Sequence, residues 1–283
     1  MQKLCLASLL MVVAGLSTQT LAAAESFAPL KEGMPPQSVE ALWADYDPRA
    51  EPLDVEILKE WQEDGVVMQV LRYRVGIFKG QKSMMAAVYG YPKGAGNLPG
   101  LVQAHGGGQY ADFRAVLTNA KRGYATISIA WAGRIHAPDF RVDRDGVKLF
   151  TDQATDDPDY KLTTDWGALD GYHAPARYGA SSMGVKAARY TLDDVESPRN
   201  CCYFLWPLAA RRALTFLEQQ PQVDGERLGI YGHSMGGKIT TLTAGIDKRV
   251  KAAAPSCGGI SNKTENELYQ KTIADARYLD QLS

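Results

Sequence analysis

A serine lies between two glycines in the stretch GHSMG, Gly232–Gly236, and this spacing is typical of an enzyme nucleophile. A strand-like apolar run precedes it, and a run that favours a helix follows it. A serine in such a strand-to-helix turn is exposed at a helix N-terminus, where free N–H groups and the helix dipole favour negative charge. Ser234 is therefore predicted to be the nucleophile of an acyl transfer, and the backbone amide of Met235 is predicted to be a donor to the oxyanion.

A second glycine-rich stretch, HGGG at His105–Gly108, ends an apolar strand upstream. Glycines leave their backbone amides unobstructed, so the amide of Gly107 or Gly108 could join that of Met235 in holding an oxyanion. His105 is expected to orient this loop and not to act as a base. For both stretches the alternative is a glycine-rich turn without chemistry.

A serine hydroxyl needs a base to accept its proton, and histidine is the usual one. The chain has four histidines, and none follows Ser234; they are His105, His136, His173 and His233. Three explanations stay open. The one that we favour is a longer protein, with the acid and histidine encoded after Ser283. A base could instead come from His173 or, as second choice, His136, or the chain could be a non-catalytic homologue. His233 is not expected to serve, because the residue before such a serine points away from it.

The elements that must position these residues alternate between strands and helices. Residues 66–78 alternate apolar and polar side chains as a half-exposed strand does, and residues 83–92 are the predicted antiparallel partner. Further strands are predicted at 98–108, 124–131, 227–232 and 250–257, and helices at 110–123, 202–220 and 236–245. This order predicts an α/β fold, a mostly parallel sheet with helices on both faces.

The first 24 residues have the pattern of a signal peptide. Lys3 precedes an apolar run, Leu4–Leu16, and small residues lead to a cleavage site near Ala24. A membrane anchor is the alternative, but the run is shorter than the ~20 residues that a span needs. We therefore expect a periplasmic or secreted protein without a membrane segment after cleavage. An N-terminal arm with short helices is predicted at 25–65, followed by the α/β domain at 66–283.

A long insertion, residues 132–200, separates a predicted strand from the next helix and is rich in Asp, Tyr, Gly and Arg. Loops of this length inside a domain are usually functional or form a subdomain. Trp166, Tyr172 and His173 are therefore predicted to bind substrate. The alternative is a structural excursion over the edge of the sheet.

Composition excludes several function classes. Without Lys3 the mature chain carries 30 basic and 32 acidic residues, which gives no electrostatic footprint for nucleic acid or anionic lipid. The remaining cysteines are Cys201, Cys202 and Cys257. A disulfide between Cys257 and either neighbour of the pair, and three buried thiols, are equal alternatives. Their spacing does not fit a zinc site, and no metal or organic cofactor is implied.

Residues 66–257 resemble the α/β-hydrolase superfamily. The antiparallel pair, LVQAHGGG, YATISIAW, RLGIYGHSMGG and VKAAAPSCGG follow in the order of that family. The lead-in DGER, the double glycine after the serine and DKRVKAAAPSCGG are similar to the branch of dienelactone hydrolases, acetylxylan esterases and cephalosporin deacetylases. The chain departs from this branch at two positions. Dienelactone hydrolases carry a cysteine in place of Ser234, and acetylxylan esterases of the deacetylase type usually carry Gln in place of Met235.

The resemblance implies that an acid and a histidine follow the nucleophile on two later strands. The fold is therefore expected to be incomplete at the C-terminus, with the last two strands absent. Carboxylates on the last predicted helix are interpreted as solvated charges; they are Glu265, Glu267, Asp275 and Asp280. The resemblance implies an exported serine carboxylic-ester hydrolase acting on a small-molecule or carbohydrate ester, such as an acetylated carbohydrate. The rivals are a prolyl-oligopeptidase-like peptidase and an inactive binding module, and the oligomeric state stays open.

Overall fold

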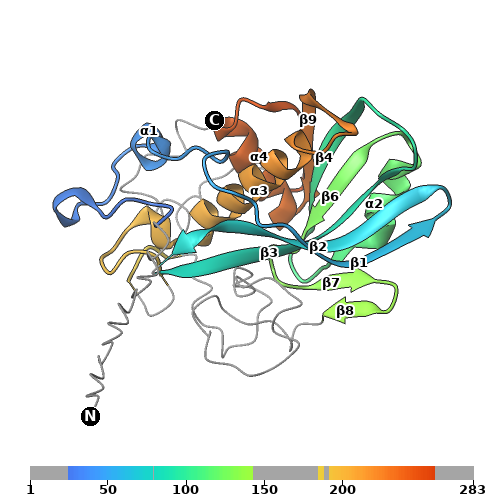
Figure 1. Cartoon of the computed structure of the whole chain (residues 1–283). Helices are drawn as coiled ribbons and strands as arrows, with labels where there is room; N and C mark the ends of the chain where they lie inside the picture. The colour runs from blue at the N-terminus through green and yellow to red at the C-terminus, as the bar shows by residue number, and fades with distance from the viewer. Residues whose placement is uncertain (1–24, 79, 143–183, 188–190, 259–283) are drawn as a thin grey trace, which may run out of the picture.

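The computed structural model describes residues 25–78, 80–142, 184–187 and 191–258. A seven-stranded sheet forms its centre, with the strand order β1-β2-β3-β6-β4-β9-β10 (Figure 1). In that order the strands are Glu56–Glu63, Val66–Phe78, Gln81–Pro92, Ala125–Ile129, Leu98–Ala104, Val223–His233 and Val250–Ser256.

The sheet has an antiparallel and a parallel half. β1, β2, β3 and β6 pair antiparallel with one another in that order, whereas β6, β4, β9 and β10 pair in parallel. The sheet in the described residues is therefore more evenly mixed than the mostly parallel one that we predicted. Ala104 pairs with Gly232, and His233 pairs with Ser256, so β4, β9 and β10 end side by side. The loops after these strands consequently meet at one edge of the sheet.

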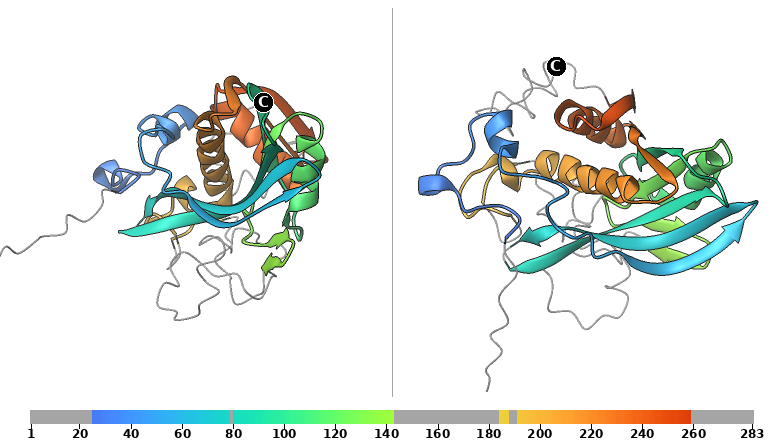
Figure 2. Two further views of the ribbon diagram at one scale, coloured as in Figure 1. Left: turned by 45° about the vertical axis from the view of Figure 1, so that its right-hand side comes forward. Right: turned by 45° about the horizontal axis from the view of Figure 1, so that its top comes forward.

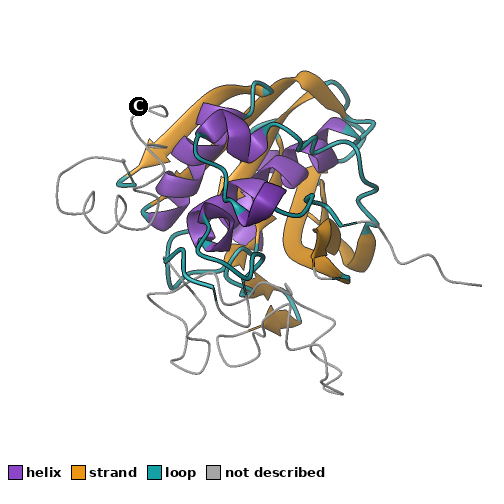
Figure 3. Cartoon of the chain, turned by 90° about the vertical axis from the view of Figure 1, so that its left-hand side faces the viewer, coloured by secondary structure: helices purple, strands orange, loops and turns teal. Residues whose placement is uncertain are grey.

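Helices cover both faces of the sheet, as the sequence predicts. α3 (Cys202–Glu218) and α4 (Met235–Ile246) lie on one face, and α2 (Phe113–Ala120) lies on the other (Figure 2). Leu71 and Tyr73 of β2 join the apolar cluster under α3 and α4. Met68 and Val70 join the cluster under α2, because successive side chains of a strand point to opposite faces. The helical layer against the sheet is also visible in Figure 3.

The predicted N-terminal arm is wrong in its second half. The first half of the arm contains the helices η1 (Lys31–Gly33) and α1 (Val39–Trp43). In the second half, residues 56–63 form the strand β1 at the edge of the sheet. Asp64 and Gly65 connect β1 to β2 with φ of 51° and 79°. Two residues with positive φ make the tight turn that suits a β-hairpin, and Asp-Gly is a typical sequence for it. The hairpin chemistry therefore decides the structure of this segment.

A buried arginine of α3 binds the chain before and within β2. Arg212 is 1% exposed, and its guanidinium donates to four backbone carbonyls at 2.5–2.9 Å. The acceptors are the carbonyl oxygens of Pro48, Glu51, Pro52 and Arg74. A guanidinium can be buried without a carboxylate partner when its N–H groups are satisfied in this way.

A small three-stranded sheet lies beside the main one. It contains β5 (Ala111–Asp112), β7 (Ile135–Ala137) and β8 (Phe140–Val142). β7 and β8 belong to the predicted insertion, and its last residues form η6 (Pro198–Asn200). No helix in the described residues is long and apolar enough to cross a membrane. The predicted signal peptide lies outside the described residues.

Candidate active site

Ser234 occupies the turn between β9 and α4, so the predicted strand-turn-helix setting is confirmed. Its backbone has φ 55° and ψ −116°, a conformation that residues other than glycine rarely adopt. The Ser234 N–H donates to the carbonyl of Ser256 at 2.7 Å, and the Ser234 carbonyl accepts from the Lys238 N–H at 3.1 Å. The strained turn is thus fixed by β10 on one side and by the first turn of α4 on the other.

The Ser234 hydroxyl does not cap the helix that begins beside it. Ser234 is the N-cap of α4, yet its side chain accepts no bond from the first turn. Serine at this position normally accepts such a bond, and the exchange for alanine costs about 1 kcal/mol. The half-buried hydroxyl lies at the positive end of α4, where the amide of Met235 has no acceptor within the helix.

Glycines bring the Ser234 turn against the predicted oxyanion loop. A Cβ on Gly236 would overlap the carbonyl groups of Ala104 and His105 at the end of β4. A Cβ on Gly106 would lie 3.2 Å from the carbonyl oxygen of His233. The two glycine-rich stretches therefore contact each other through backbone atoms, which only residues without a side chain permit.

A third backbone segment, which sequence reasoning missed, closes the turn from the side of β10. A Cβ on Gly258 would overlap the carbonyl oxygen of Ser234 and the Cα of Gly237. The signal was present as a glycine pair directly after the last predicted strand, Gly258 and Gly259. It contributed to the family resemblance but was not connected with the nucleophile.

The oxyanion loop turns tightly at its glycines. The Gln109 N–H donates to the Gly106 carbonyl at 3.2 Å, and the Gly106 N–H donates to Gln109 Oε1 at 2.9 Å. The amide of Gly106 is thus bonded to the side chain of Gln109, and the predicted donors are the amides of Gly107 or Gly108. Gly107 is half-buried, and Gly108 is exposed with φ 72°. Their role as oxyanion donors stays a prediction.

His105 lies buried at the start of the loop. Its Nδ1 is 2.8 Å from the Gly106 carbonyl oxygen, and its ring stacks on Trp131 at 4.8 Å between centroids and 20° between planes. These contacts agree with the expectation that His105 orients the loop.

Known proteins are similar to this chain in part of the sequence and in fold. Residues 211–281, less than half of the chain, match the family model described as BAAT / Acyl-CoA thioester hydrolase C terminal. Acetyl Xylan Esterase 1 from Thermoanaerobacterium sp. JW/SL YS485 is similar, with 17% identity, a TM-score of 0.50 and coverage of 90% of this chain and 79% of that one. The chain has the α/β-hydrolase fold. The fold that the sequence predicts is thus confirmed.

Two further similar structures have TM-scores below that of the Thermoanaerobacterium esterase. The acetyl xylan esterase from Paenibacillus sp. R4 has 22% identity and a TM-score of 0.45, with coverage of 72% of this chain and 54% of that one. The glucuronoyl esterase from Solibacter usitatus has 15% identity and a TM-score of 0.41, with coverage of 71% and 51%. The chain therefore spans about half the length of both. No curated protein sequence matches the chain significantly.

The side chains of the other described histidines, His136 and His233, contact residues other than Ser234. His136 Nδ1 lies 3.4 Å from Asp112 Oδ2 and 3.1 Å from Arg114 Nη2. Burial raises the pKa of Asp112, but the hydrogen bonds and charge of Arg114 outweigh it, and the pKa lies below its usual value. The ring of His233 is exposed, with Nδ1 3.2 Å from Ser256 Oγ. Within the described residues, neither His136 nor His233 is hydrogen-bonded to the hydroxyl of Ser234.

Several predicted site residues lie outside the described part of the chain. They are Trp166, Tyr172 and His173; the carboxylates interpreted as solvated charges, Glu265, Glu267, Asp275 and Asp280, lie there as well. The proton acceptor for Ser234 is therefore not assigned by the described residues.

Both alternatives for the cysteines are wrong. Cys201 and Cys202 are buried at the start of α3, whereas Cys257 is exposed after β10, and no disulfide joins any two of the three. Cys257 thus contacts solvent and is neither a disulfide partner nor a core residue. Among the described side chains, no three metal-ligating groups cluster together.

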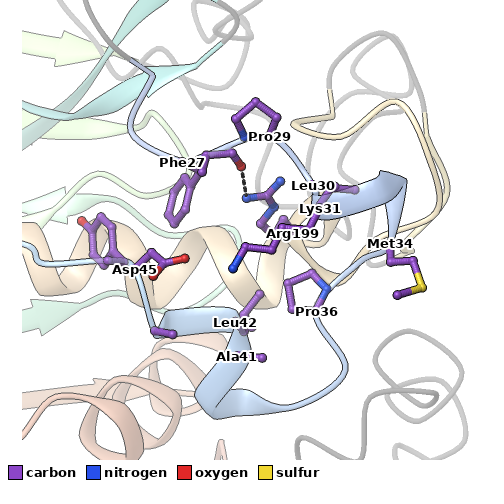
Figure 4. A pocket seen from close by; sticks show the side chains of 13 residues that line it. Phe27, Pro29, Leu30, Lys31, Met34, Pro36, Ala41, Leu42, Asp45 and Arg199 are labelled. Atoms are coloured by element: carbon purple, nitrogen blue, oxygen red, sulfur yellow. Dashed lines mark hydrogen bonds between the residues drawn. The ribbon is translucent and has the colours of Figure 1, made fainter.

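A cavity of about 300 Å³ lies between the N-terminal segment and Arg199 (Figure 4). Arg199 is held by Asp193 through two hydrogen bonds of 2.6 and 3.0 Å, and it donates to the Ala28 carbonyl at 3.1 Å. None of the residues lining the cavity comes from the Ser234 turn or the oxyanion loop. The cavity is therefore separate from the predicted catalytic residues.

Proposed function

We propose that this protein is a serine ester hydrolase that acts through an acyl-enzyme on Ser234. The observation that carries this proposal is the backbone of Ser234, held at φ 55° and ψ −116° with a hydroxyl that caps nothing. Such a conformation costs about 1–3 kcal/mol and persists where the surroundings enforce it, which is common at active sites. Glycine packing on three sides enforces it here.

In the proposed reaction, Ser234 Oγ attacks the ester carbonyl carbon and its proton passes to a base. The carbonyl oxygen becomes an oxyanion that accepts hydrogen bonds from the amides of Met235 and of Gly107 or Gly108. The alcohol leaves with a proton, and water then hydrolyses the acyl-enzyme. The described residues do not assign this base, and His173 is the candidate that the sequence offers first.

For the substrate we propose a hydrophilic ester such as an acetylated carbohydrate. The fold similarity to the Thermoanaerobacterium acetyl xylan esterase supports this class. The polar and aromatic insertion with Trp166, Tyr172 and His173 supports it as well, because sugar ligands need polar groups beside aromatic surfaces. The leader-like residues 1–24 suggest that the enzyme acts in the periplasm or outside the cell.

A second candidate substrate is an acyl-CoA thioester. The match of residues 211–281 to an acyl-CoA thioester hydrolase domain favours it. The same nucleophile and oxyanion donors would serve, with a thiol as the leaving group. Turnover of acetylated xylo-oligosaccharides and of acetyl-CoA, measured side by side, distinguishes the two substrates.

The proposal is tested by labelling with a fluorophosphonate, which reacts with activated serines. We expect one adduct on the peptide containing Ser234, and no adduct in Ser234→Ala. Ser256→Ala is the matched control, because Ser256 is a nearby serine that contacts His233, and it should be labelled like the unaltered protein. A folded protein that stays unlabelled, or an adduct that persists in Ser234→Ala, would contradict the proposal and favour a binding module.

A further inference from the structure

The segment after β6 holds the oxyanion loop at both ends. The indole N–H of Trp131 donates to the His105 carbonyl at 2.9 Å, and Nε of Arg134 donates to the Gln109 carbonyl at 2.8 Å. These two carbonyls bracket Gly107 and Gly108. Trp131 is 0% exposed and Arg134 is 3% exposed, so water competes little for either bond.

Further contacts support each of the two points. The imidazole of His105 stacks on the ring of Trp131. At the other end, the Ala111 N–H donates to the Arg134 carbonyl at 3.0 Å. Arg134 is thus bonded to the chain on both sides of Tyr110. The loop is fixed by groups that do not belong to it.

We propose that Trp131 and Arg134 are positioning residues that aim the amides of Gly107 and Gly108 at the oxyanion; this rests on the proposed function. A loop of consecutive glycines has more conformational freedom than any other sequence of its length. Oxyanion donors must be held within about 0.5 Å of their productive position. Two buried bonds from a neighbouring segment supply that restraint at the two carbonyls that flank Gly107 and Gly108.

The inference predicts a specific kinetic signature. Oxyanion donors act on charge that develops in the transition state, so a loosened loop lowers kcat and leaves KM unchanged. Loss of one donor costs ~100-fold or more, and a donor that is present but misplaced should cost about tenfold.

Trp206 offers a matched control. It is a tryptophan, 0% exposed like Trp131, and its indole N–H has no hydrogen-bond partner within the described residues. Trp131→Phe and Trp206→Phe therefore remove the same atoms from the same core, but only the first removes a bond to the loop. Arg134→Met removes the hydrogen bond to the Gln109 carbonyl and serves as the second variant if Trp131→Phe does not fold.

The first measurement is steady-state hydrolysis of para-nitrophenyl acetate by the full chain. We expect kcat to fall about tenfold in Trp131→Phe and in Arg134→Met, with KM within about twofold of the unaltered protein. Trp206→Phe should keep its kcat within about twofold. Equal losses of kcat in both tryptophan variants, or none in Trp131→Phe, would overturn the inference.

The second measurement, amide hydrogen exchange of the peptide 104–110, does not depend on activity. We expect faster exchange in Trp131→Phe and Arg134→Met, and no change in Trp206→Phe. Unchanged exchange in the first two variants would overturn the inference even if the enzyme is active. A protein without hydrolytic activity would contradict the proposed function, and the exchange data would still decide whether Trp131 and Arg134 hold the loop.

Discussion

The two ends of α4 are built in opposite ways. At its N-terminal end Ser234 has a strained backbone, and its side chain forms no cap. At its C-terminal end Asp247 is buried and accepts bonds from Arg249 at 2.7 and 2.9 Å and from Arg211 at 3.2 Å. The Asp247 N–H also donates to the Thr243 carbonyl at 2.9 Å. The side chain of Ser234 is thus not bound to its own helix, whereas the side chain of Asp247 is bound by two arginines.

This difference indicates where the helix is anchored. Burial raises the pKa of Asp247, but the hydrogen bonds and charge of Arg249 and the charge of Arg211 outweigh it, so the pKa lies below its usual value. The charged carboxylate thus stabilises the fold at this end. The end that carries Ser234 depends instead on backbone packing at glycines, which leaves the hydroxyl free for chemistry.

The largest expected effect comes from Ser234→Ala. Ester hydrolysis should fall by at least about 1000-fold, because the variant lacks the nucleophile. The free energy of unfolding should stay within about 0.5 kcal/mol, since the hydroxyl caps nothing. Kinetics and urea denaturation measure the two quantities. A loss of stability typical of an N-cap would show that the two ends of α4 do not differ in this way.

Gly236→Ala tests the packing that replaces a cap at this end. The new methyl group would overlap the carbonyls of Ala104 and His105, so the free energy of unfolding should fall by about 3 kcal/mol. Gly96→Ala is the matched control, because nothing lies within 4 Å of its Cβ position. Equal stability of the two variants in urea denaturation would contradict the close backbone contact.

Asp247→Asn tests the charged end. Arg249 and Arg211 would lose their ionised partner, so the free energy of unfolding at neutral pH should fall by about 2 kcal/mol. Hydrolysis of para-nitrophenyl acetate should be retained in the folded fraction. A fall in the free energy of unfolding of less than about 0.5 kcal/mol, as for a surface substitution, would show that the carboxylate does not anchor α4.

The same residue gives a pH dependence with a defined sign. Because the pKa of Asp247 is lower in the folded chain, its stabilising contribution is present above the ordinary pKa of an aspartate, about 4. The contribution is lost as the pH falls through the folded pKa. Denaturation at several acid pH values should therefore show a steeper loss of stability in the unaltered protein than in Asp247→Asn. Parallel curves would exclude Asp247 as a contributor.

The smallest effect is expected from Ser197→Ala. Ser197 is the N-cap of η6. Ser197 Oγ accepts from the Arg199 N–H at 3.2 Å, so its removal should cost about 1 kcal/mol of unfolding free energy. Hydrolytic activity should not change. Comparison with Ser234→Ala separates a serine that caps from one that does not.

Much of the fold could be predicted from local sequence patterns. From residue 66 to 257, hydrophobic periodicity predicts the order of the main-sheet strands and of α2, α3 and α4, but not the short strands β5, β7 and β8. The glycine spacing around Ser234 predicts the turn that the structure has. β1 was missed because its charged, half-exposed edge lacks a clear alternation, although Asp64 and Gly65 carry the hairpin signal. Residue types thus predicted the elements with a clear hydrophobic period and missed the strand without one.

The sequence by itself determined which residue is offered as nucleophile and which glycines lie beside it. Only the tertiary structure decided what holds them. Trp131 and Arg134 bond to main-chain carbonyls, and every residue carries such a carbonyl, so no pattern of side chains reveals the partner. The close contact between Gly236 and the end of β4 likewise follows from strand register, which sets the two loops side by side. Residue types thus predict the reactive groups, whereas the position of these groups depends on contacts between segments far apart in the chain.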